Sequence, residues 1–226
     1  MRGKWTPGIL VVFAAAGLSC AVARAQGQQP APPPKAQSKA QVSDYPETDI
    51  GGLYYAAILN SSTGNGVTQT TKNGSGGMFE VRHLMKPLVG FELSMGFNNE
   101  TETIAPTATN CGFVCNQKPF TDTSIDLLWS FDWVFSKQFG RVRPYALAGL
   151  GWYYGIPGNS IYGVNNPLRT VPNAGGGVDY FVTQHLGLRG EFRGNFYTAP
   201  DLSTIFPSSG ARTHMYQPAG GIFYAF

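Results

Sequence analysis

Apolar and polar residues alternate along the chain from about residue 48, and the segment 120–135 shows this pattern most clearly. Its apolar positions are Ile125, Leu127, Trp129, Phe131, Trp133 and Phe135. The positions between them include Ser124, Asp126, Ser130 and Asp132, while Leu128 and Val134 break the pattern. A period of two is typical of a β-strand whose two faces meet different environments. The sequence therefore predicts strands in this region.

Eight runs of this kind are separated by connections of alternating length. The runs lie near 48–60, 75–86, 88–99, 120–135, 142–154, 171–183, 185–197 and 213–226. The second, fourth and sixth connections are short, whereas the first, third, fifth and seventh are long and polar. This alternation is typical of outer-membrane barrels, whose strands need roughly 9–11 residues to cross the membrane. We therefore expect an all-β fold over residues 48–226, an eight-stranded antiparallel up-and-down transmembrane β-barrel.

The apolar faces of these runs are assigned to lipid and the polar faces to the barrel lumen. A water-soluble barrel such as a lipocalin would turn the apolar faces inward around a ligand. However, an eight-stranded barrel has room inside only for side chains or one small ligand, and the Trp, Phe, Met and Leu residues would overfill it. The charged residues placed in the lumen are then Glu80, Arg82, Glu92, Asp126, Asp132, Asp179, Arg189, Glu191 and Arg193.

Six acids face three arginines in this lumen set, so these residues alone do not balance their charges. Arg143 near a turn, trapped water or protonated carboxyl groups would complete the balance. Charges in a narrow lumen are costly unless they pair and form hydrogen bonds. We therefore expect a plug of paired polar side chains rather than an open pore.

Aromatic residues near the ends of the runs are expected at the membrane interface, where amphipathic rings are favoured. They are Trp129, Trp133, Trp152, Tyr153, Tyr154, Tyr180, Tyr197, Tyr216 and Tyr224. The general preference of aromatic residues for strands also explains part of this enrichment.

Residues 1–25 have the composition of a secretory signal peptide. They combine a basic start, MRGK, an apolar stretch too short for a membrane helix, and the small residues of ARA before the cleavage point. Cys20 raises the alternative of a lipoprotein signal, but Gly17 stands where such signals prefer Leu or Val. Residues 26–47 are rich in Pro, Gln and Ala, and we expect a flexible periplasmic linker there.

The charge of the chain changes when the signal is removed. The full sequence has 16 Lys and Arg and 13 Asp and Glu, a formal net charge of +3. The signal contains Arg2, Lys4 and Arg24 and no acid, so the remaining chain has 13 residues of each sign. The basic excess therefore belongs to the signal and gives no support for a nucleic-acid partner.

Cys111 and Cys115 are the two cysteines that remain after the signal. An exported chain meets an oxidising compartment, which favours a disulfide between them. A metal site is the alternative, but His83, His185 and His214 lie far from these cysteines in sequence. We expect neither a metal nor a cofactor.

The chain resembles the small barrels of the porin family and of the outer-membrane-protein-A type. The resemblance covers about 48–226 and rests on the signal, on VRPYALAGLGW and NAGGGVDYFVTQHLGLRGEFRGNF, and on the ending QPAGGIFYAF. Members of that family end in an aromatic residue with apolar residues at every second place, which here are Ile222, Tyr224 and Phe226. The resemblance implies that these residues are a signal for the barrel-assembly machinery and that the last strand pairs with the first.

The sequence favours a structural role in the envelope or an interaction at the cell surface. We expect a monomer in the cell outer membrane, in contact with its lipid, with any extracellular ligand at long loops such as 98–120 and 155–171. A narrow porin for small solutes or ions is the alternative. A lipid A-modifying enzyme is a further one, with His214 near Ser208 and Ser209. We do not expect catalysis, because the compact His-x-Ser spacing of lipid A deacylases is missing.

Overall fold

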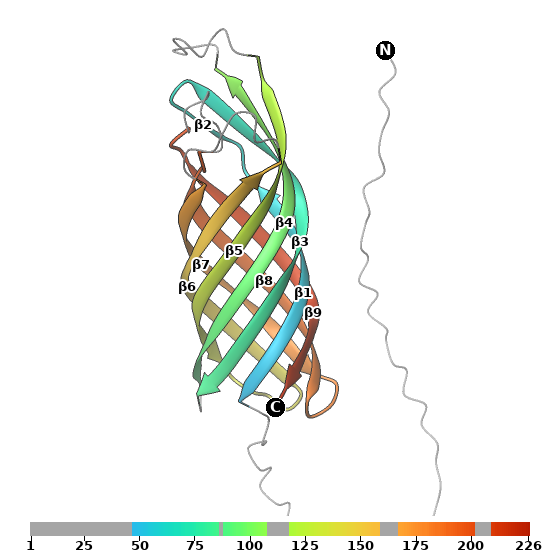
Figure 1. The fold of residues 1–226 in the computed structure, drawn as a ribbon. Coiled ribbons are helices and arrows are strands. Elements are labelled where there is room, and N and C mark those ends of the chain that lie inside the picture. The colour runs from blue at the N-terminus through green and yellow to red at the C-terminus, as the bar shows by residue number, and fades with distance from the viewer. Residues whose placement is uncertain (1–46, 86–87, 108–117, 159–166, 202–208) are drawn as a thin grey trace, which may run out of the picture. The chain divides into compact units, whose positions relative to one another are not determined.

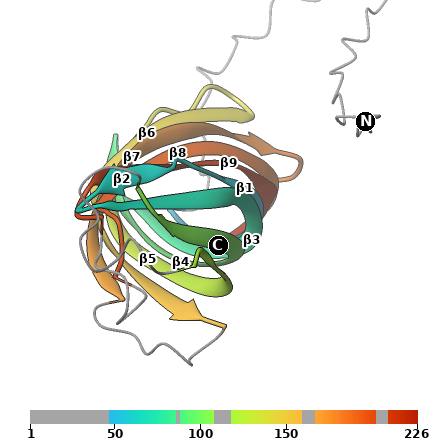
Figure 2. The same cartoon turned by 90° about the horizontal axis from the view of Figure 1, so that it is seen from above.

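Eight long antiparallel strands form a closed barrel in the computed structural model, which describes residues 47–85, 88–107, 118–158, 167–201 and 209–226 (Figure 1). Seen along its axis, the strands form a ring (Figure 2). The long strands are β1 (Thr48–Leu59), β3 (Val67–Met85), β4 (Val89–Pro106), β5 (Phe120–Ser136), β6 (Val142–Pro157), β7 (Leu168–Phe181), β8 (Leu186–Thr198) and β9 (Arg212–Ala225). The predicted fold class is therefore confirmed.

Pairing between the first and last strands closes the ring. β1 pairs with β9 from Asp49–Ala225 to Leu59–Met215, and on its other side β1 pairs with β3. The remaining long strands pair with their neighbours in chain order. Among the residues that the structure describes, no helix is both long and apolar enough to span a membrane.

The first long connection is mostly a strand hairpin, which corrects the sequence prediction of a polar loop. The short strand β2 (Ser62–Gly64) pairs with the start of β3. Asn65 and Gly66 join them with positive φ angles of 49° and 76°, as the two central residues of a type I′ turn require. Hydrophobic periodicity did not predict this part of β3, because polar residues occupy both of its faces.

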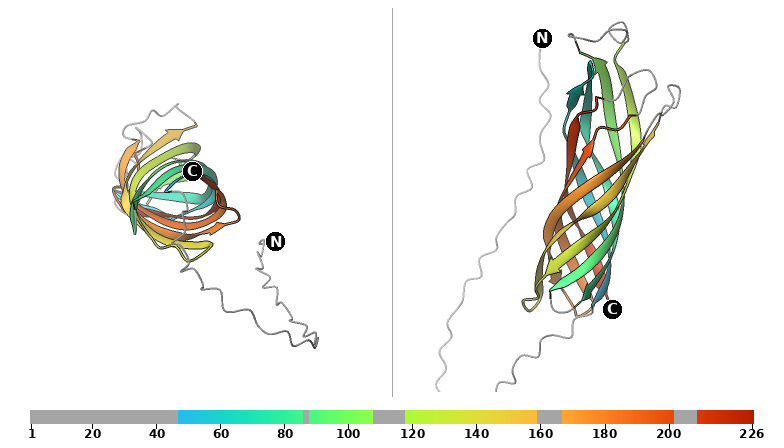
Figure 3. Two further views of the ribbon diagram at one scale, coloured as in Figure 1. Left: turned by 90° about the horizontal axis from the view of Figure 1, so that it is seen from below. Right: turned by 90° about the vertical axis from the view of Figure 1, so that its left-hand side faces the viewer.

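The outward faces of the strands are apolar and the inward faces are polar. Side chains that the sequence assigned to lipid are exposed, among them Leu93, Met95, Phe97, Ile125, Trp133, Leu188, Phe192 and Phe196. Leu128 and Val134, which broke the alternation, turn inward and are buried. The long strands run side by side and obliquely around this interior (Figure 3).

The pairing between β7 and β8 ends before either strand does. Their ladder runs from Phe181–Gly187 to Asn173–Asn195. Beyond that point β7 continues to Leu168 beside β6, while β8 continues to Thr198 beside β9. Pro172 is the first β7 residue past the last pair, and it has no N–H with which to continue a ladder.

Candidate functional site

The structure places the side chains of all nine predicted lumen residues in the barrel interior, with at most about one-twentieth of each residue exposed. Eight of them form one connected set of ion pairs and hydrogen bonds. We call this set, together with Arg143 and Asp49, the arginine network. The ninth residue, Asp126, lies apart from it and contacts Tyr153 and Asn98.

Neighbouring strands supply the short-range pairs of the arginine network. Arg82 lies directly opposite Glu92 in the β3–β4 register, and Asp179 lies opposite Arg189 in the β7–β8 register. Arg82 Nε donates to Glu92 at 2.7 Å, and Arg189 Nε donates to Asp179 at 2.7 Å. Opposite charges at facing positions of an antiparallel pair stabilise the register.

Other pairs of the network cross the whole lumen. Arg193 on β8 donates to Glu92 on β4 at 2.7 Å, and these strands lie on opposite sides of the eight-membered ring. Arg143 on β6 donates in the same way to Asp49 on β1 at 2.6 Å. Because single ion pairs join opposite walls, the lumen is bridged at these levels.

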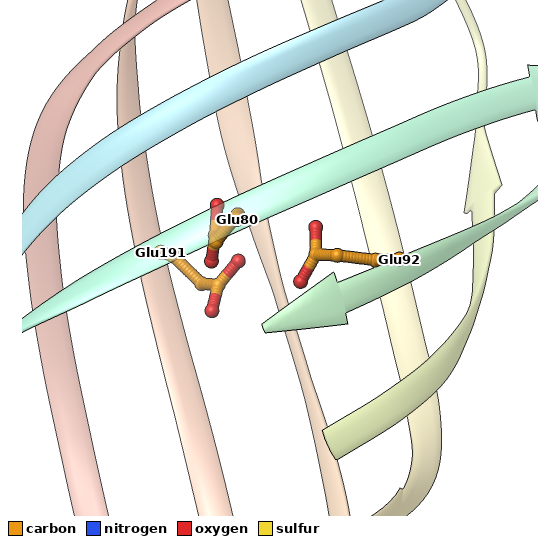
Figure 4. Close-up of side chains that lie close together, drawn as sticks. All are labelled: Glu80, Glu92 and Glu191. Atoms are coloured by element: carbon orange, nitrogen blue, oxygen red, sulfur yellow. The ribbon is translucent and has the colours of Figure 1, made fainter. Parts of the chain in front are cut away.

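Glu80, Glu92 and Glu191 point toward one another in the middle of the lumen (Figure 4). One carboxylate oxygen from each lies within 4.8 Å of the others, a spacing that a metal ion could bridge. Each of the three, however, also contacts an arginine, with Arg189 on Glu80 and Arg193 on Glu92 and Glu191. The guanidinium groups therefore already supply positive charge to all three carboxylates.

Sequence reasoning missed Asp49 and Tyr145 and named Arg143 only as a possible supplement. Asp49 contacts both Arg143 and Arg189, while the Arg82 guanidinium lies over the Tyr145 ring at 4.0 Å from its centre. Asp49 could have been found from its phase, because Gly51, Leu53 and Tyr55 follow it at alternate inward positions. The contact with Tyr145 depends on the register of distant strands.

We call the end of the barrel that carries the long connections its outer end. A second polar cluster, the outer acid group, lies toward this end of the lumen and consists of Glu100, Glu102 and Asp126. Tyr153 donates to Asp126 at 2.6 Å, and Gln69 donates to Glu102 at 3.0 Å. Within the described ranges, no Lys or Arg forms an ion pair with any of the three acids. Among the described residues, this group therefore differs from the arginine network in having no cation paired with its acids.

Glu102 lies beyond the membrane-spanning part of β4. The outward residues of this strand change from Phe97 to Asn99 and Thr101, which marks the end of the apolar band. Burial raises the pKa of Glu102 to about 7; the hydrogen bond from Gln69 opposes this shift. Sequence reasoning did not find this site, because the alternating apolar residues that predicted the strand end at Phe97.

Comparison with known proteins agrees with this geometry. A family model described as the outer membrane protein beta-barrel domain matches residues 12–216. The chain belongs to this family. No curated protein matches the sequence.

Solved outer membrane barrels have the same fold at low sequence identity. The outer membrane protein OprG from Pseudomonas aeruginosa has a TM-score of 0.56 and 11% identity, and the match covers 80% of this chain and 96% of that one. Neisserial surface protein A has a TM-score of 0.52 and 14% identity, with 80% and 97% covered. These similarities show the fold alone.

Two of the aromatic residues predicted at the membrane interface instead lie inside this outer membrane barrel. Tyr153 is fully buried and Tyr197 nearly so, and their rings stack with centres 5.2 Å apart. Both alternate with outward residues near the outer ends of their strands, so the sequence position was right but the face was wrong. Trp133, Tyr180 and Tyr224 are exposed, as expected.

The histidine considered for lipid chemistry contacts no described serine. His214 Nε2 lies 2.6 Å from the Asn60 side chain, and its ring contacts Tyr216. Ser209 Oγ instead bonds to Ser62 Oγ at 2.9 Å. Ser208 lies outside the described residues, and the described geometry gives no support for a Ser–His pair.

Several predicted features of this family member lie outside the described residues, namely the signal over 1–25, nearly all of the linker over 26–47, and both Cys111 and Cys115. The three residues of the predicted assembly signal are described. Ile222, Tyr224 and Phe226 share the outward face at the end of β9, each about half exposed or more.

Proposed function

We propose that this outer membrane barrel has a structural or surface-interaction role in the cell envelope and that its lumen is plugged. The bridging of opposite strands by the arginine network carries this proposal. The contacts Arg193–Glu92 and Arg143–Asp49 each span the lumen, and the residues involved are buried. Because several carboxylates share each guanidinium, an ion would have to break more than one charge-assisted hydrogen bond to pass.

The same proposal covers export, oligomeric state, assembly and binding at the cell surface. The chain is exported through a cleaved signal and acts as a monomer. The apolar end of β9 is the signal that the barrel-assembly machinery recognises. The long outer connections carry any extracellular ligand site. The outward positions of Ile222, Tyr224 and Phe226 support the role of β9, because a row of apolar side chains at the membrane edge is accessible to another protein.

Conductance in planar lipid bilayers tests the plugged lumen. The purified chain should insert without producing stable current steps above the background of the bare bilayer. Protease protection of reconstituted vesicles would verify insertion, and an open barrel of known conductance would verify detection. Regular single-channel steps from the folded chain would contradict the plug and support the alternative, a narrow porin for ions or small solutes.

A further inference from the structure

A hollow of about 550 Å³ lies in the outer part of the barrel wall, where β7 separates from β8. It is lined by Thr170 and Pro172 on β7, Phe196 and Thr198 on β8, and Arg212 and His214 on β9. The hollow exists because the β7–β8 ladder stops at Asn173–Asn195. Above this pair, Arg169 Nε reaches across to the carbonyl oxygen of Ala199 at 3.3 Å.

The hollow lies where the outer surface changes from apolar to polar. Along β9, the outward residues pass from Tyr216 to His214 and Arg212 toward the outer end. Along β8, they pass from Phe196 to Thr198. Aromatic residues of outer-membrane barrels mark the boundary between hydrocarbon and headgroups. The hollow therefore opens at the depth of the lipid headgroups in the outer leaflet.

The charge of the hollow suits an anion. Arg212 contributes a guanidinium, and no acidic residue is among the lining residues. None of the described residues forms an ion pair with Arg212. The Thr170 and Thr198 side chains provide hydroxyl groups beside it. A volume of about 550 Å³ is typical of sites for small organic molecules and far larger than a single ion needs.

The lipid-facing surface below the hollow combines glycines with the exposed ring of Phe192. Gly190 and Gly220 face each other on β8 and β9. A Cβ at Gly190 would meet no atom within 4 Å, so crowding does not require glycine there. Phe192 stacks on Tyr216, with ring centres 5.7 Å apart. Phe192 and Tyr216 therefore offer an acyl chain apolar contact beneath the hollow.

We propose that the hollow binds the phosphorylated headgroup of an outer-leaflet lipid. Arg212 contacts the phosphate, Thr198 and Thr170 donate hydrogen bonds to the headgroup, and the acyl chains lie against Phe192 and Phe196. A guanidinium can form two parallel hydrogen bonds with a phosphate, which adds a defined geometry to the attraction between the charges. This site does not depend on the state of the lumen, so a conducting barrel would leave the proposal intact.

Binding of lipid A to the folded chain in detergent tests the proposal, with native mass spectrometry as the readout. The probes are lipid A with both phosphates and lipid A from which the phosphates have been removed. The wild-type chain should retain the phosphorylated form about tenfold more tightly. Arg212→Gln should abolish this preference. Thr198→Trp, which fills the hollow without changing charge, should weaken the binding of both forms.

Lys72→Gln is the matched control, because Lys72 is an exposed cation near the outer end of β3, on another part of the ring. It should leave lipid binding unchanged, and the gel mobility of each unheated variant verifies its fold. Equal retention of the two lipid forms, or unchanged binding in folded Arg212→Gln, would overturn the proposal. Displacement of lipid A by millimolar inorganic phosphate would overturn it as well, since the site would then select the free anion.

Discussion

Arg193 shows how much of the lumen depends on one side chain. Its guanidinium contacts Glu92 and Glu191 at 2.7 Å and Asp132 at 3.0 Å. Its Nη1 also donates to the hydroxyl of Ser94. These partners come from β4, β5 and β8, so a single cation neutralises acids on both sides of the ring. A buried ion pair is costly to break because removal of one partner leaves the others charged and unpaired.

Replacement of Arg193 by methionine should therefore destabilise the barrel strongly. We expect the free energy of unfolding to fall by about 3–5 kcal/mol, because four acids, including Glu80, lose a shared counter-charge. Urea titration in lipid vesicles, followed by gel mobility, measures this change. Arg141→Met is the control: Arg141 is exposed beside a turn, and its loss should cost no more than about 0.5 kcal/mol. Equal losses in the two variants would contradict the role of the network.

Glu102 should make the outer part of the barrel sensitive to pH. Its pKa in the folded state is raised to about 7, above the ordinary value of 4.5, so the folded form holds the proton more tightly. The stability of this region is therefore lost as the pH rises from about 4.5 to about 7. The effect is on the order of 1–3 kcal/mol.

Amide protection factors for residues 68–72 and 101–105 measure this effect, since they correct for the intrinsic influence of pH on exchange. Protection in the wild type should be lower at pH 8 than at pH 5. Glu102→Gln should remove most of the difference, because a neutral amide accepts the Gln69 hydrogen bond at both pH values. An equal pH dependence in both chains would show that Glu102 is not its source.

At the scale of strands, hydrophobic periodicity predicted the membrane-spanning segments of the strands. It did not predict the segments that continue beyond the membrane at the outer end. The apolar residues of β5 alternate because one face meets lipid, so its bounds and its faces followed from the sequence. The outer part of β3 has threonines and polar residues on both faces, and the sequence suggested a loop there. Tyr153 and Tyr197 were placed on the wrong face for a similar reason, since an amphipathic ring suits both the interface and a polar lumen.

The lumen could be predicted only in part. Alternation correctly turned Arg82, Glu92 and Arg193 inward, because that requires only the phase of each strand. It did not reveal that Arg193 meets Glu92, because the register and stagger of strands on opposite walls are set by the closure of the whole ring. Asp126 shows the same limit, since it shares a face with Asp132 on β5 but joins the outer acid group.

The last strand is expected to matter for assembly more than for packing. Ile222, Tyr224 and Phe226 face outward and contribute little to the interior. Deletion of Phe226 should lower the amount of folded barrel in the outer membrane severalfold, while barrel refolded from urea remains stable. Phe135→Ala is the matched control, because Phe135 is also an exposed aromatic at the same end of the barrel. Similar membrane yields for both variants would remove the assembly role.

For the whole molecule, the pairing of β1 with β9 closes the wall of the barrel, and the described strands β7 and β8 are neighbours that separate near its outer end. A closed ladder satisfies its backbone groups internally, which makes unfolding in detergent slow. We expect the unheated chain to migrate differently from the boiled chain on a detergent gel and to fractionate with the outer membrane. A chain with no mobility shift that purified from the periplasm would instead be a soluble barrel with inverted faces.

The pairing of Asp49 with Ala225 has a consequence for the order of the chain. This pair closes the ring with the same antiparallel hydrogen bonds that join every other neighbouring pair, so the ring in space has no first or last strand. A circular permutant that connects residue 226 to residue 48 and opens between Met85 and Val89 would preserve each strand's neighbours. The permutant would end on β3 instead of β9. Its assembly would therefore show whether the ring forms when the residues of β9 no longer stand at the end of the chain.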